Sequence, residues 1–246
     1  FYTVERAFNL AERYQCPVFL LLDQVLSQSN YTIPRLDPSR FVIDRGKLLD
    51  AEAVALAYGG NGRRYRRYEL TDDGISTRVI PGTPGVTTIY TNTNEHTEEG
   101  YITEEAVVRT AMVEKRVIQR MAQISDDPDL PSPRHFGPPE APIGFIGYGS
   151  VYGPIQEAME RLTARGQPAG FLELRTLWPF PAQEVQRFVR QCQLVYVVEY
   201  SAGKQLRGLI QREATGPIPQ KLRSILRYDG KVMTPGYVIG EVKEEA

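Results

Sequence analysis

The segment TNTNEHTEEGYITEE, residues 91–105, holds His96, one of only two histidines in the chain. Its acidic neighbours are Glu95, Glu98 and Glu99. An imidazole beside carboxylates suits either a metal site or general acid–base catalysis. The HExxH arrangement is absent, however, so a metal site would need further ligands from elsewhere in the chain. Turn-forming residues flank the histidine, namely Asn92, Asn94 and Gly100. We therefore expect a positioned polar loop.

A second candidate is the glycine-rich turn GFIGYGS, which runs from Gly144 to Ser150. Its spacing, G-x-x-G-x-G, differs from the dinucleotide fingerprint, and the next apolar segment, residues 169–177, does not end in an acidic residue. A tight strand-to-helix turn is therefore favoured over a dinucleotide site. The helix start at Ser150 and Gly153 would still suit an isolated anion.

The segment GRRYRRYEL, residues 62–70, interleaves arginines with Tyr65 and Tyr68. The arginines are Arg63, Arg64, Arg66 and Arg67. Such a patch is typical of single-stranded nucleic-acid binding, and it would also suit a phosphate-bearing cofactor. Because the whole chain balances 29 Lys and Arg against 30 Asp and Glu, a solvated or interface-forming loop is favoured and no nucleic-acid partner is expected.

The two cysteines, Cys16 and Cys192, stand beside apolar runs and far apart in the sequence. We interpret them as buried, reduced thiols, which indicates a reducing compartment. No CxxC pair is present, so the chain is not expected to hold an iron–sulfur or zinc site of the usual spacing. The longest apolar run, PVFLLLD, is far shorter than the ~20 residues that span a bilayer. We expect a soluble, cytoplasmic protein with no membrane partner.

The elements that must position these residues begin with a helix over residues 3–15, where apolar side chains recur at helical spacing. A wholly apolar strand is predicted next, over residues 17–23, and it ends at Asp23. A helix that leads into a strand buried on both faces is typical of a parallel α/β sheet, in which every strand needs neighbours. We therefore predict that residues 1–45 are the end of an incomplete α/β domain.

Residues 46–140 are expected to cross between domains, because turn residues are dense and regular periodicity is weak up to residue 103. A long amphipathic helix is then predicted over about 104–124, with Thr103 as its N-cap. Its apolar face would consist of Val107, Val108, Ala111, Met112, Ile118, Met121 and Ile124. The proline-rich segment 125–142, with a solvated His135, is interpreted as a linker.

Residues 141–246 alternate between apolar runs and helical periodicity. Strands are predicted over residues 143–149, 169–177, 194–199 and 221–228, with amphipathic helices between them. This order predicts a parallel sheet with right-handed crossovers, so the fold class expected for the chain is α/β.

Four segments, taken in order, resemble the α subunit of 2-oxoacid:ferredoxin oxidoreductases, in the 2-oxoglutarate-type branch. They are AFNLAERYQCPVFLLLDQVLSQS (7–29), YELTDDGISTRVIPG (68–82), NEHTEEGYITEE (94–105) and VVEYSAGKQLRGLI (197–210). The fourth looks like the transketolase C-terminal-like domain, although Tyr200 and Ser201 stand where the family has an asparagine.

The resemblance implies that residues 1–45 end a thiamine-diphosphate pyrimidine-binding domain and that residues 141–246 form a transketolase C-terminal-like domain. It also implies an enzyme that oxidatively decarboxylates a 2-oxoacid to an acyl-CoA and passes the electrons to ferredoxin. Thiamine diphosphate with magnesium would be bound mainly by a β subunit, and the iron–sulfur cluster would belong to a partner chain or to ferredoxin. Coenzyme A would be the co-substrate, and an oligomer is expected.

No residue of this chain matches the family's catalytic glutamate or its residues for the 2-oxoacid, so the chain alone is expected to be catalytically incomplete, with no catalytic and no metal-binding residue. The binding candidates are Asp23, at the end of its predicted strand, and Arg78, Glu95 and His96 in the crossing segment. These last three would order the path between domains or face coenzyme A and the β subunit. A network that pins the loops is the favoured interpretation of all four.

Two other functions stay open. One is a non-catalytic assembly module that uses the C-terminal α/β domain for subunit contacts. The other is a portion of a thiamine enzyme with a different acceptor, such as a transketolase or a lipoamide-linked 2-oxoacid dehydrogenase. The DGIS and NEH segments count against this last alternative.

Overall fold

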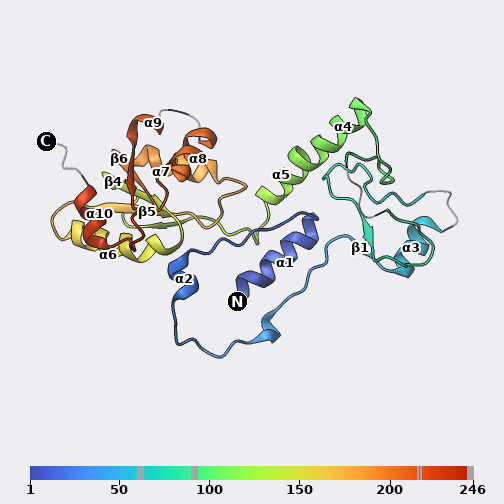
Figure 1. The fold of residues 1–246 in the computed structure, drawn as a ribbon, viewed down its shortest axis with the longest axis horizontal. Coiled ribbons are helices and arrows are strands. Elements are labelled where there is room, and N and C mark those ends of the chain that lie inside the picture. Colours follow the sequence, from blue (N-terminus) through green and yellow to red (C-terminus); the bar gives the residue numbers. More distant parts are fainter. Residues whose placement is uncertain (60–63, 90–93, 215, 217, 243–246) are drawn as a thin grey trace. The chain divides into compact units, whose positions relative to one another are not determined.

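The computed structural model describes residues 1–59, 64–89, 94–214, 216 and 218–242. These residues form two compact units (Figure 1). Unit 1 comprises Phe1–Leu20 and Ile33–Leu130, and unit 2 comprises Leu21–Thr32 and Pro131–Ala246. Each unit has its own hydrophobic core.

Unit 2 is built on a five-stranded sheet in the order β3-β5-β4-β6-β7. The strands are β3 (Arg134–Phe136), β4 (Ile143–Gly147), β5 (Ala169–Glu173), β6 (Leu194–Glu199) and β7 (Leu222–Leu226). The last four pair in parallel, which confirms the predicted α/β fold class and parallel sheet. Part of the predicted linker is instead the antiparallel edge strand β3, where His135 lies opposite Leu172; His135 is exposed, as predicted.

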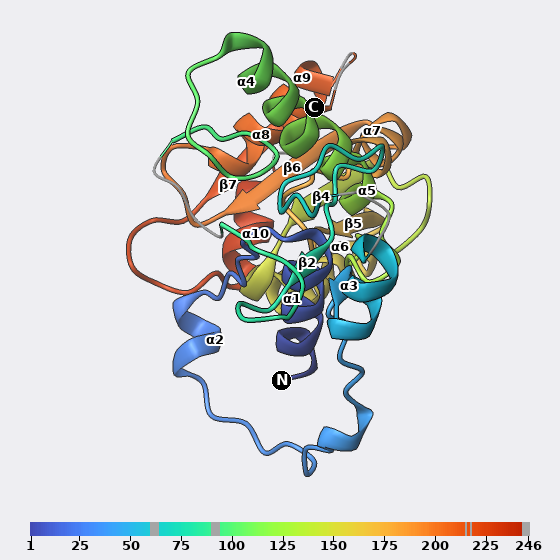
Figure 2. The ribbon, with the colours of Figure 1, turned by 90° about the vertical axis from the view of Figure 1, so that its right-hand side faces the viewer.

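Helices cover both faces of this sheet, with α7 and α8 on one side and α6 and α10 on the other (Figure 1 and Figure 2). The elements that follow β4 in unit 2 are η3 (Gly149–Val151, a 3₁₀ turn), α6 (Tyr152–Thr163), α7 (Ala182–Gln191), α8 (Gln205–Glu213), α9 (Ile218–Lys221) and α10 (Pro235–Glu241). Phe145 and Ile146, neighbours on β4, are both 0% exposed and belong to opposite cores. The alternation of side chains along a strand thus places an apolar layer on each face.

The prediction of a strand over residues 17–23 was wrong. Within the described chain these residues pair with no strand, and the side chains of Phe19 and Leu22 are 82% and 68% exposed. Apolar composition makes a strand possible, but hydrogen bonds to neighbouring strands define one. Asp23 instead caps the short helix α2 (Gln24–Gln28), where its Oδ1 accepts a hydrogen bond from the backbone N–H of Leu26 at 2.9 Å.

Unit 1 has little regular structure around a small core. Before residue 80 its elements are α1 (Tyr2–Tyr14), the 3₁₀ turn η1 (Pro38–Arg40), β1 (Leu48–Leu49), α3 (Ala51–Tyr58) and β2 (Arg78–Val79). The helix predicted over residues 3–15 is confirmed as α1, and β1 pairs with β2 in parallel. The core consists of Leu10, Tyr14, Ile75 and Ile124.

The long helix of unit 1 contains a π-helical turn in its middle. Its consecutive parts are α4 (Ala106–Val113), the π-turn η2 (Glu114–Gln119) and α5 (Arg120–Ser125). The predicted helix is confirmed, but Glu105 rather than Thr103 is the N-cap residue. Val107 and Ile118, predicted on the buried face, are 81% and 64% exposed. Neither this helix nor any other in the described chain is long and apolar enough to cross a membrane.

Candidate functional site

The polar loop around His96 is a tight hairpin. His96 lies opposite Ile102 in an antiparallel bridge, the Thr97 N–H donates to the Tyr101 carbonyl at 2.8 Å, and the Thr103 N–H donates to the Glu95 carbonyl at 3.0 Å. At the tip, Gly100 has a φ of +101°, and a Cβ on it would lie 2.9 Å from the Cβ of Ile89. Gly100 is therefore needed both for its backbone conformation and for the close approach.

The imidazole of His96 is held by two contacts. Its ring centroid lies 3.9 Å from that of Tyr68, with 36° between the planes, and its Nδ1 lies 2.9 Å from the Thr97 carbonyl oxygen. Because a carbonyl oxygen only accepts, Nδ1 carries the proton, and Nε2 of the neutral ring is an acceptor. No described residue bonds this Nε2. The fixed ring therefore presents one open hydrogen-bonding atom.

Glu95 has a different role from its neighbour His96. Its two carboxylate oxygens accept from the guanidinium nitrogens of Arg116, in the π-turn, at 3.0 and 2.5 Å. The hydrogen bonds from Arg116 hold the pKa of Glu95 below its usual value, against the opposing effect of burial. Glu95 is therefore an ionised anchor that fixes the hairpin to the long helix.

Lys115, next to Arg116 in the π-turn, holds the second loop of this cluster. Its Nζ donates to the carbonyl oxygens of Tyr68 and Glu69 at 2.7 and 2.8 Å and to Oγ of Ser76 at 2.5 Å. Lys115 and Ser76 are each only 2% exposed. Burial, with the nearby charges of Arg120 and Arg67, lowers the pKa of Lys115 to about 7.

Gly74 brings the TDDGIS segment directly against the π-turn. Its φ is +70°, and a Cβ on it would lie 2.6 Å from the Lys115 carbonyl oxygen and 2.9 Å from the Arg120 nitrogen. Since real side chains do not tolerate such distances, only glycine fits here. The YELTDDGIS and NEHTEEGY segments thus meet on one helical turn, which we call the π-turn cluster: Tyr68, Glu69, Gly74, Ser76, Glu95, His96, Lys115 and Arg116.

The remaining two candidate residues lie outside the π-turn cluster. Arg78, on β2, forms an ion pair with Glu12 of α1 and donates to the Arg45 carbonyl at 3.1 Å. These contacts join β2 to α1. Asp23 belongs to unit 2.

Asp23 lies at the carboxyl end of β4. In an open α/β sheet ligands bind where the connections from neighbouring strands diverge, and here β4 connects to β5 on one side while β6 lies on the other. The Asp23 Oδ2 accepts from the Ser150 N–H at 2.8 Å, and a Cβ on Gly149, whose φ is +67°, would lie 3.0 Å from the same oxygen. Although burial opposes ionisation, hydrogen bonds from Ser150 and Leu26 lower the pKa of Asp23.

Glu199, at the carboxyl end of β6, caps the start of helix α8 in the same way. It is 3% exposed, and its carboxylate accepts from the backbone N–H groups of Leu206 at 2.9 Å and Arg207 at 3.2 Å, at the start of α8. The anion expected near Ser150 is thus Asp23 of the same chain. At the starts of η3 and α8, backbone N–H groups that could bind a diphosphate are therefore already bonded to carboxylates of the chain.

Two arginines of the patch, Arg66 and Arg67, bond to other side chains of unit 1. Arg66 forms ion pairs with Glu98 and, at 3.0 Å, with Glu69, and Arg67 donates to Oε1 of Gln15 at 2.8 Å. Arg63 and Asn92, which also entered the sequence-based interpretation, lie outside the described residues. Arg66 and Arg67 therefore hold loops together, whereas Arg64 is exposed.

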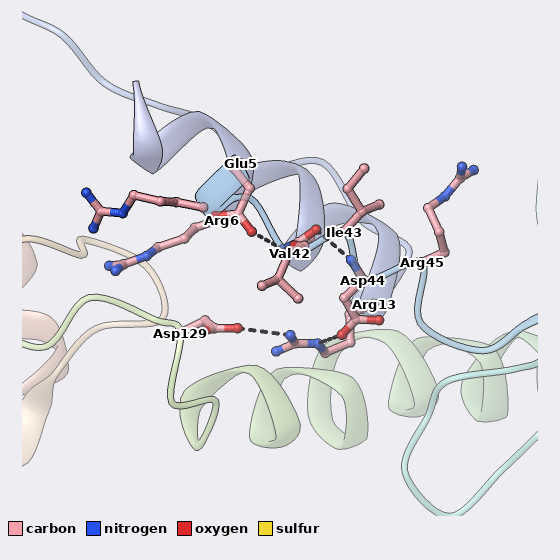
Figure 3. A pocket seen from close by; sticks show the side chains of 10 residues that line it. Glu5, Arg6, Arg13, Val42, Ile43, Asp44, Arg45 and Asp129 are labelled. Atoms are coloured by element: carbon pink, nitrogen blue, oxygen red, sulfur yellow. Dashed lines mark hydrogen bonds and ion pairs between the residues drawn. The ribbon is translucent and has the colours of Figure 1, made fainter. Parts of the chain in front are cut away.

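A groove of about 620 Å³ in unit 1 surrounds a second charged centre (Figure 3). Arg13 of α1 donates through Nε to Asp44 at 2.8 Å and through Nη2 to Asp129 at 2.9 Å, and its Nη1 pairs with Asp127. Tyr14 also donates to Asp127. The three carboxylates offset the charge of Arg13, so this centre ties α1 to the segments around residues 44 and 128.

Sequence reasoning missed Lys115, Arg116 and Glu199. A lysine three residues after the buried Met112, on the apolar side of a helix, was the available signal for Lys115. An acidic residue between an apolar strand and the next helix was the signal for Glu199. The described residues contain no group of three or more His, Cys, Asp or Glu that could hold a metal ion.

Residues 141–238 match the family described as pyruvate:ferredoxin oxidoreductase core domain II. The chain is 37% identical over 99% of its length to 2-oxoacid:ferredoxin oxidoreductase 2, subunit alpha, of Aeropyrum pernix, and it covers 36% of that protein. It is 27% identical over 83% of its length to the 2-oxoglutarate synthase subunit KorA of Archaeoglobus fulgidus, of which it covers 47%. The chain therefore spans less than half the length of these curated relatives.

A solved structure gives the same family. The 2-oxoglutarate:ferredoxin oxidoreductase from Magnetococcus marinus, with 2-oxoglutarate, coenzyme A and succinyl-CoA bound, matches with a TM-score of 0.80 at 32% identity. The match covers 94% of this chain and 38% of that chain. The resemblance carried by the four motifs is confirmed, and the chain belongs to the family of 2-oxoacid:ferredoxin oxidoreductase α subunits.

Proposed function

We propose that this chain acts as part of the α subunit of an enzyme that oxidatively decarboxylates a 2-oxoacid to an acyl-CoA and passes the electrons to ferredoxin. The observation that carries the proposal is the match over 94% of the chain with an enzyme that binds 2-oxoglutarate, coenzyme A and succinyl-CoA. We propose 2-oxoglutarate as the first substrate to test, and a cytoplasmic oligomer with a β subunit as the working form.

In this proposal the β subunit holds thiamine diphosphate and magnesium. What supports this is that, at the starts of η3 and α8, Asp23 and Glu199 accept backbone N–H groups that a diphosphate would need. The iron–sulfur cluster belongs to a partner chain or to ferredoxin. This agrees with the cysteine count, since the chain has two cysteines and an iron–sulfur cluster is usually held by four.

Within this enzyme we propose distinct roles for the four candidate residues. His96 contacts coenzyme A through its open Nε2, while Glu95 and Arg78 order the crossing segment through Arg116 and Glu12. Asp23 fastens its own segment to the start of η3. Among the described residues Nε2 of His96 has no hydrogen-bond partner, and Nε of Arg78 is also unpartnered but buried.

We also propose that residues 1–45 end the pyrimidine-binding domain and that other parts of the α subunit cover the exposed apolar surface within them. An apolar groove of about 490 Å³ beside α1 supports this, together with the exposed run from Phe19 to Leu22. In the full α subunit, a cysteine placed at Leu21, which is 69% exposed here, should react slowly with a maleimide. One placed at Ser39, in the exposed turn η1, should react fast, and equal rates would contradict the domain assignment.

The function is tested by co-expressing the full α subunit with its β partner. The purified complex should contain thiamine diphosphate and should reduce ferredoxin or a viologen dye only when both coenzyme A and a 2-oxoacid are present. A complex that holds thiamine diphosphate but reduces neither acceptor with any common 2-oxoacid would refute the proposal. If the subunits then assemble without any turnover, the assembly-module alternative is favoured.

A further inference from the structure

Lys115 is a buried cation whose hydrogen-bond partners are all neutral. Its three partners are two carbonyl oxygens and one hydroxyl, at 2.5 to 2.8 Å. The charges that act on it are mainly of its own sign, from Arg120, Arg67 and Arg116, with Glu98 opposing them. A buried ammonium without a carboxylate partner is costly, and an apolar side chain of similar length would avoid that cost. What lysine adds at this position is three directed donors.

These donors fix the loop that carries Tyr68. They reach the backbone at Tyr68 and Glu69 and the side chain of Ser76, so they fasten both ends of one loop to one point on the helix. Ser76 in turn donates to the Glu69 carbonyl at 2.8 Å, which closes the network. Removing the ammonium would leave two part-buried carbonyl groups without this partner.

The adjacent Arg116 fixes the other loop, through its paired hydrogen bonds to Glu95. The π-turn therefore supports both halves of the stacked pair of Tyr68 and His96. Turns of this kind are rare and often lie at functional sites. Movement of either loop would change the direction in which the open Nε2 of His96 points.

We propose that Lys115 is a positioning residue for the enzyme's reaction: by fixing Tyr68 it orients His96, whose Nε2 accepts a hydrogen bond from a donor group of bound coenzyme A. This inference rests on the proposed function. Coenzyme A suits an acceptor nitrogen because its arm carries amide, hydroxyl and thiol donors. Lys115 itself touches no substrate.

The test uses the assembled enzyme from full-length α and β subunits, with the variant Lys115→Met. Lys231→Met is the matched control, since Lys231 is exposed. Diethyl pyrocarbonate, which reacts with neutral imidazole nitrogens, is followed by peptide mass spectrometry. His96 is the reporter and His135, in unit 2, is the internal reference. In the wild-type enzyme coenzyme A should protect His96, and in Lys115→Met this protection should fall while the labelling of His135 stays unchanged.

Kinetics give the second readout. Lys115→Met should raise the KM for coenzyme A about tenfold and leave kcat within about twofold, as expected when ground-state positioning is lost. Ser76→Ala, which removes one acceptor and keeps the lysine, should shift both readouts less and in the same direction. If Lys115→Met does not assemble with the β subunit, Ser76→Ala is used to test the proposal instead.

Three results would overturn the inference. In the first, coenzyme A protects His96 in Lys115→Met and in Ser76→Ala as fully as in the wild-type enzyme. The KM for coenzyme A is then unchanged as well, and only the unfolding temperature differs. The second is a His96 that coenzyme A never protects in the wild-type enzyme. The third is an equal effect of Lys231→Met. If the wild-type complex shows no turnover, the proposed function fails separately, and the labelling of His96 with added coenzyme A still decides the positioning claim.

Discussion

The carboxyl edge of the unit 2 sheet and the π-turn cluster of unit 1 differ in the partners that they give to buried charged groups. At the sheet edge, Asp23 and Glu199 each accept two backbone N–H bonds, and each meets the positive end of a helix or turn. In the π-turn cluster, Lys115 meets only neutral oxygens, and His96 keeps an open nitrogen. Within the described chain, both carboxylates at the sheet edge are therefore matched by backbone donors, although Oγ of Ser150 there has no partner, whereas in the cluster the buried ammonium has no carboxylate partner.

The proposed contact of coenzyme A with His96 depends on this difference. An open parallel sheet is expected to bind ligands at its carboxyl edge, yet here the chain's own carboxylates take that place. In the irregular region, Nε2 of His96 has no partner among the described residues, and the proposed contact with coenzyme A uses this atom. Four predictions test this contrast, from the largest expected effect to the smallest.

Gly74→Ala should destabilise the π-turn cluster by about 3 kcal/mol or more, because a methyl group would meet the π-turn backbone at 2.6 Å and φ is +70°. Gly82→Ala is the control, since Gly82 has a φ of +92° but no atom within 4 Å of the added Cβ. It should cost about 1 kcal/mol. Hydrogen exchange of the amides in residues 68–76 measures the difference, and equal protection in the two variants would contradict the packing.

Glu199→Ala should cost about 2 kcal/mol, because it leaves two N–H groups at the start of α8 without an acceptor in a buried site. Glu157→Ala removes an exposed pair with Arg161 and should cost about 0.3 kcal/mol. Hydrogen exchange of the α8 amides measures the effect of Glu199→Ala, and hydrogen exchange of the α6 amides measures that of Glu157→Ala. Unchanged exchange in α8 would show that the carboxylate is not needed there.

Lys115 should make stability rise with pH above neutrality. Its pKa is about 7 when folded and about 10.4 when unfolded, so between these values the unfolded chain binds more protons. The free energy of unfolding should therefore increase through this window, by at most about 1.4 kcal/mol per pH unit. Denaturation at pH 7 and pH 9, compared between wild type and Lys115→Met, measures the effect. An identical pH dependence in both would show that Lys115 does not titrate there.

Asp23→Ala should have the smallest effect, about 1 kcal/mol, since it removes a helix cap at a half-buried site. The pKa of Asp23 is lowered, so its contribution is present above about pH 3.9 and is lost as the pH falls through its folded pKa. Asp23→Asn, which keeps an acceptor oxygen, should recover part of the loss. The rate of proteolysis in the segment around α2 measures the effect. Equal rates in wild type, Asp23→Ala and Asp23→Asn would show that the hydrogen bonds of Asp23 do not hold this segment.

The fold of unit 2 was predictable because its signals are local. The apolar runs that became β4, β5 and β6 and the helical stripes between them can be read within short windows. The run of residues 17–22 has the same composition as a buried strand, but pairing is a property of two segments, and no window contains both. The antiparallel strand β3 was missed for the converse reason, since three residues give no periodicity.

The candidate site was predictable only in part. The sequence brought attention to Glu95 and His96 through their types, but not to Lys115, because a lysine in a helix usually lies at the surface. The π-turn adds one residue to the helical repeat, and a fixed 3.6-residue period therefore misplaces side chains such as Ile118. Partners such as Ser76 for Lys115 lie 39 residues apart and follow only from the folded chain.

The contact of Asp23 with Ser150 has a consequence for competition by solutes. A phosphate ion that binds a helix start does so at a concentration set by the medium, whereas Asp23 is part of the same polypeptide and its local concentration is set by the fold. Inorganic phosphate or chloride would have to displace a tethered group, so the start of η3 should remain loaded over the whole range of anion concentrations in a cell.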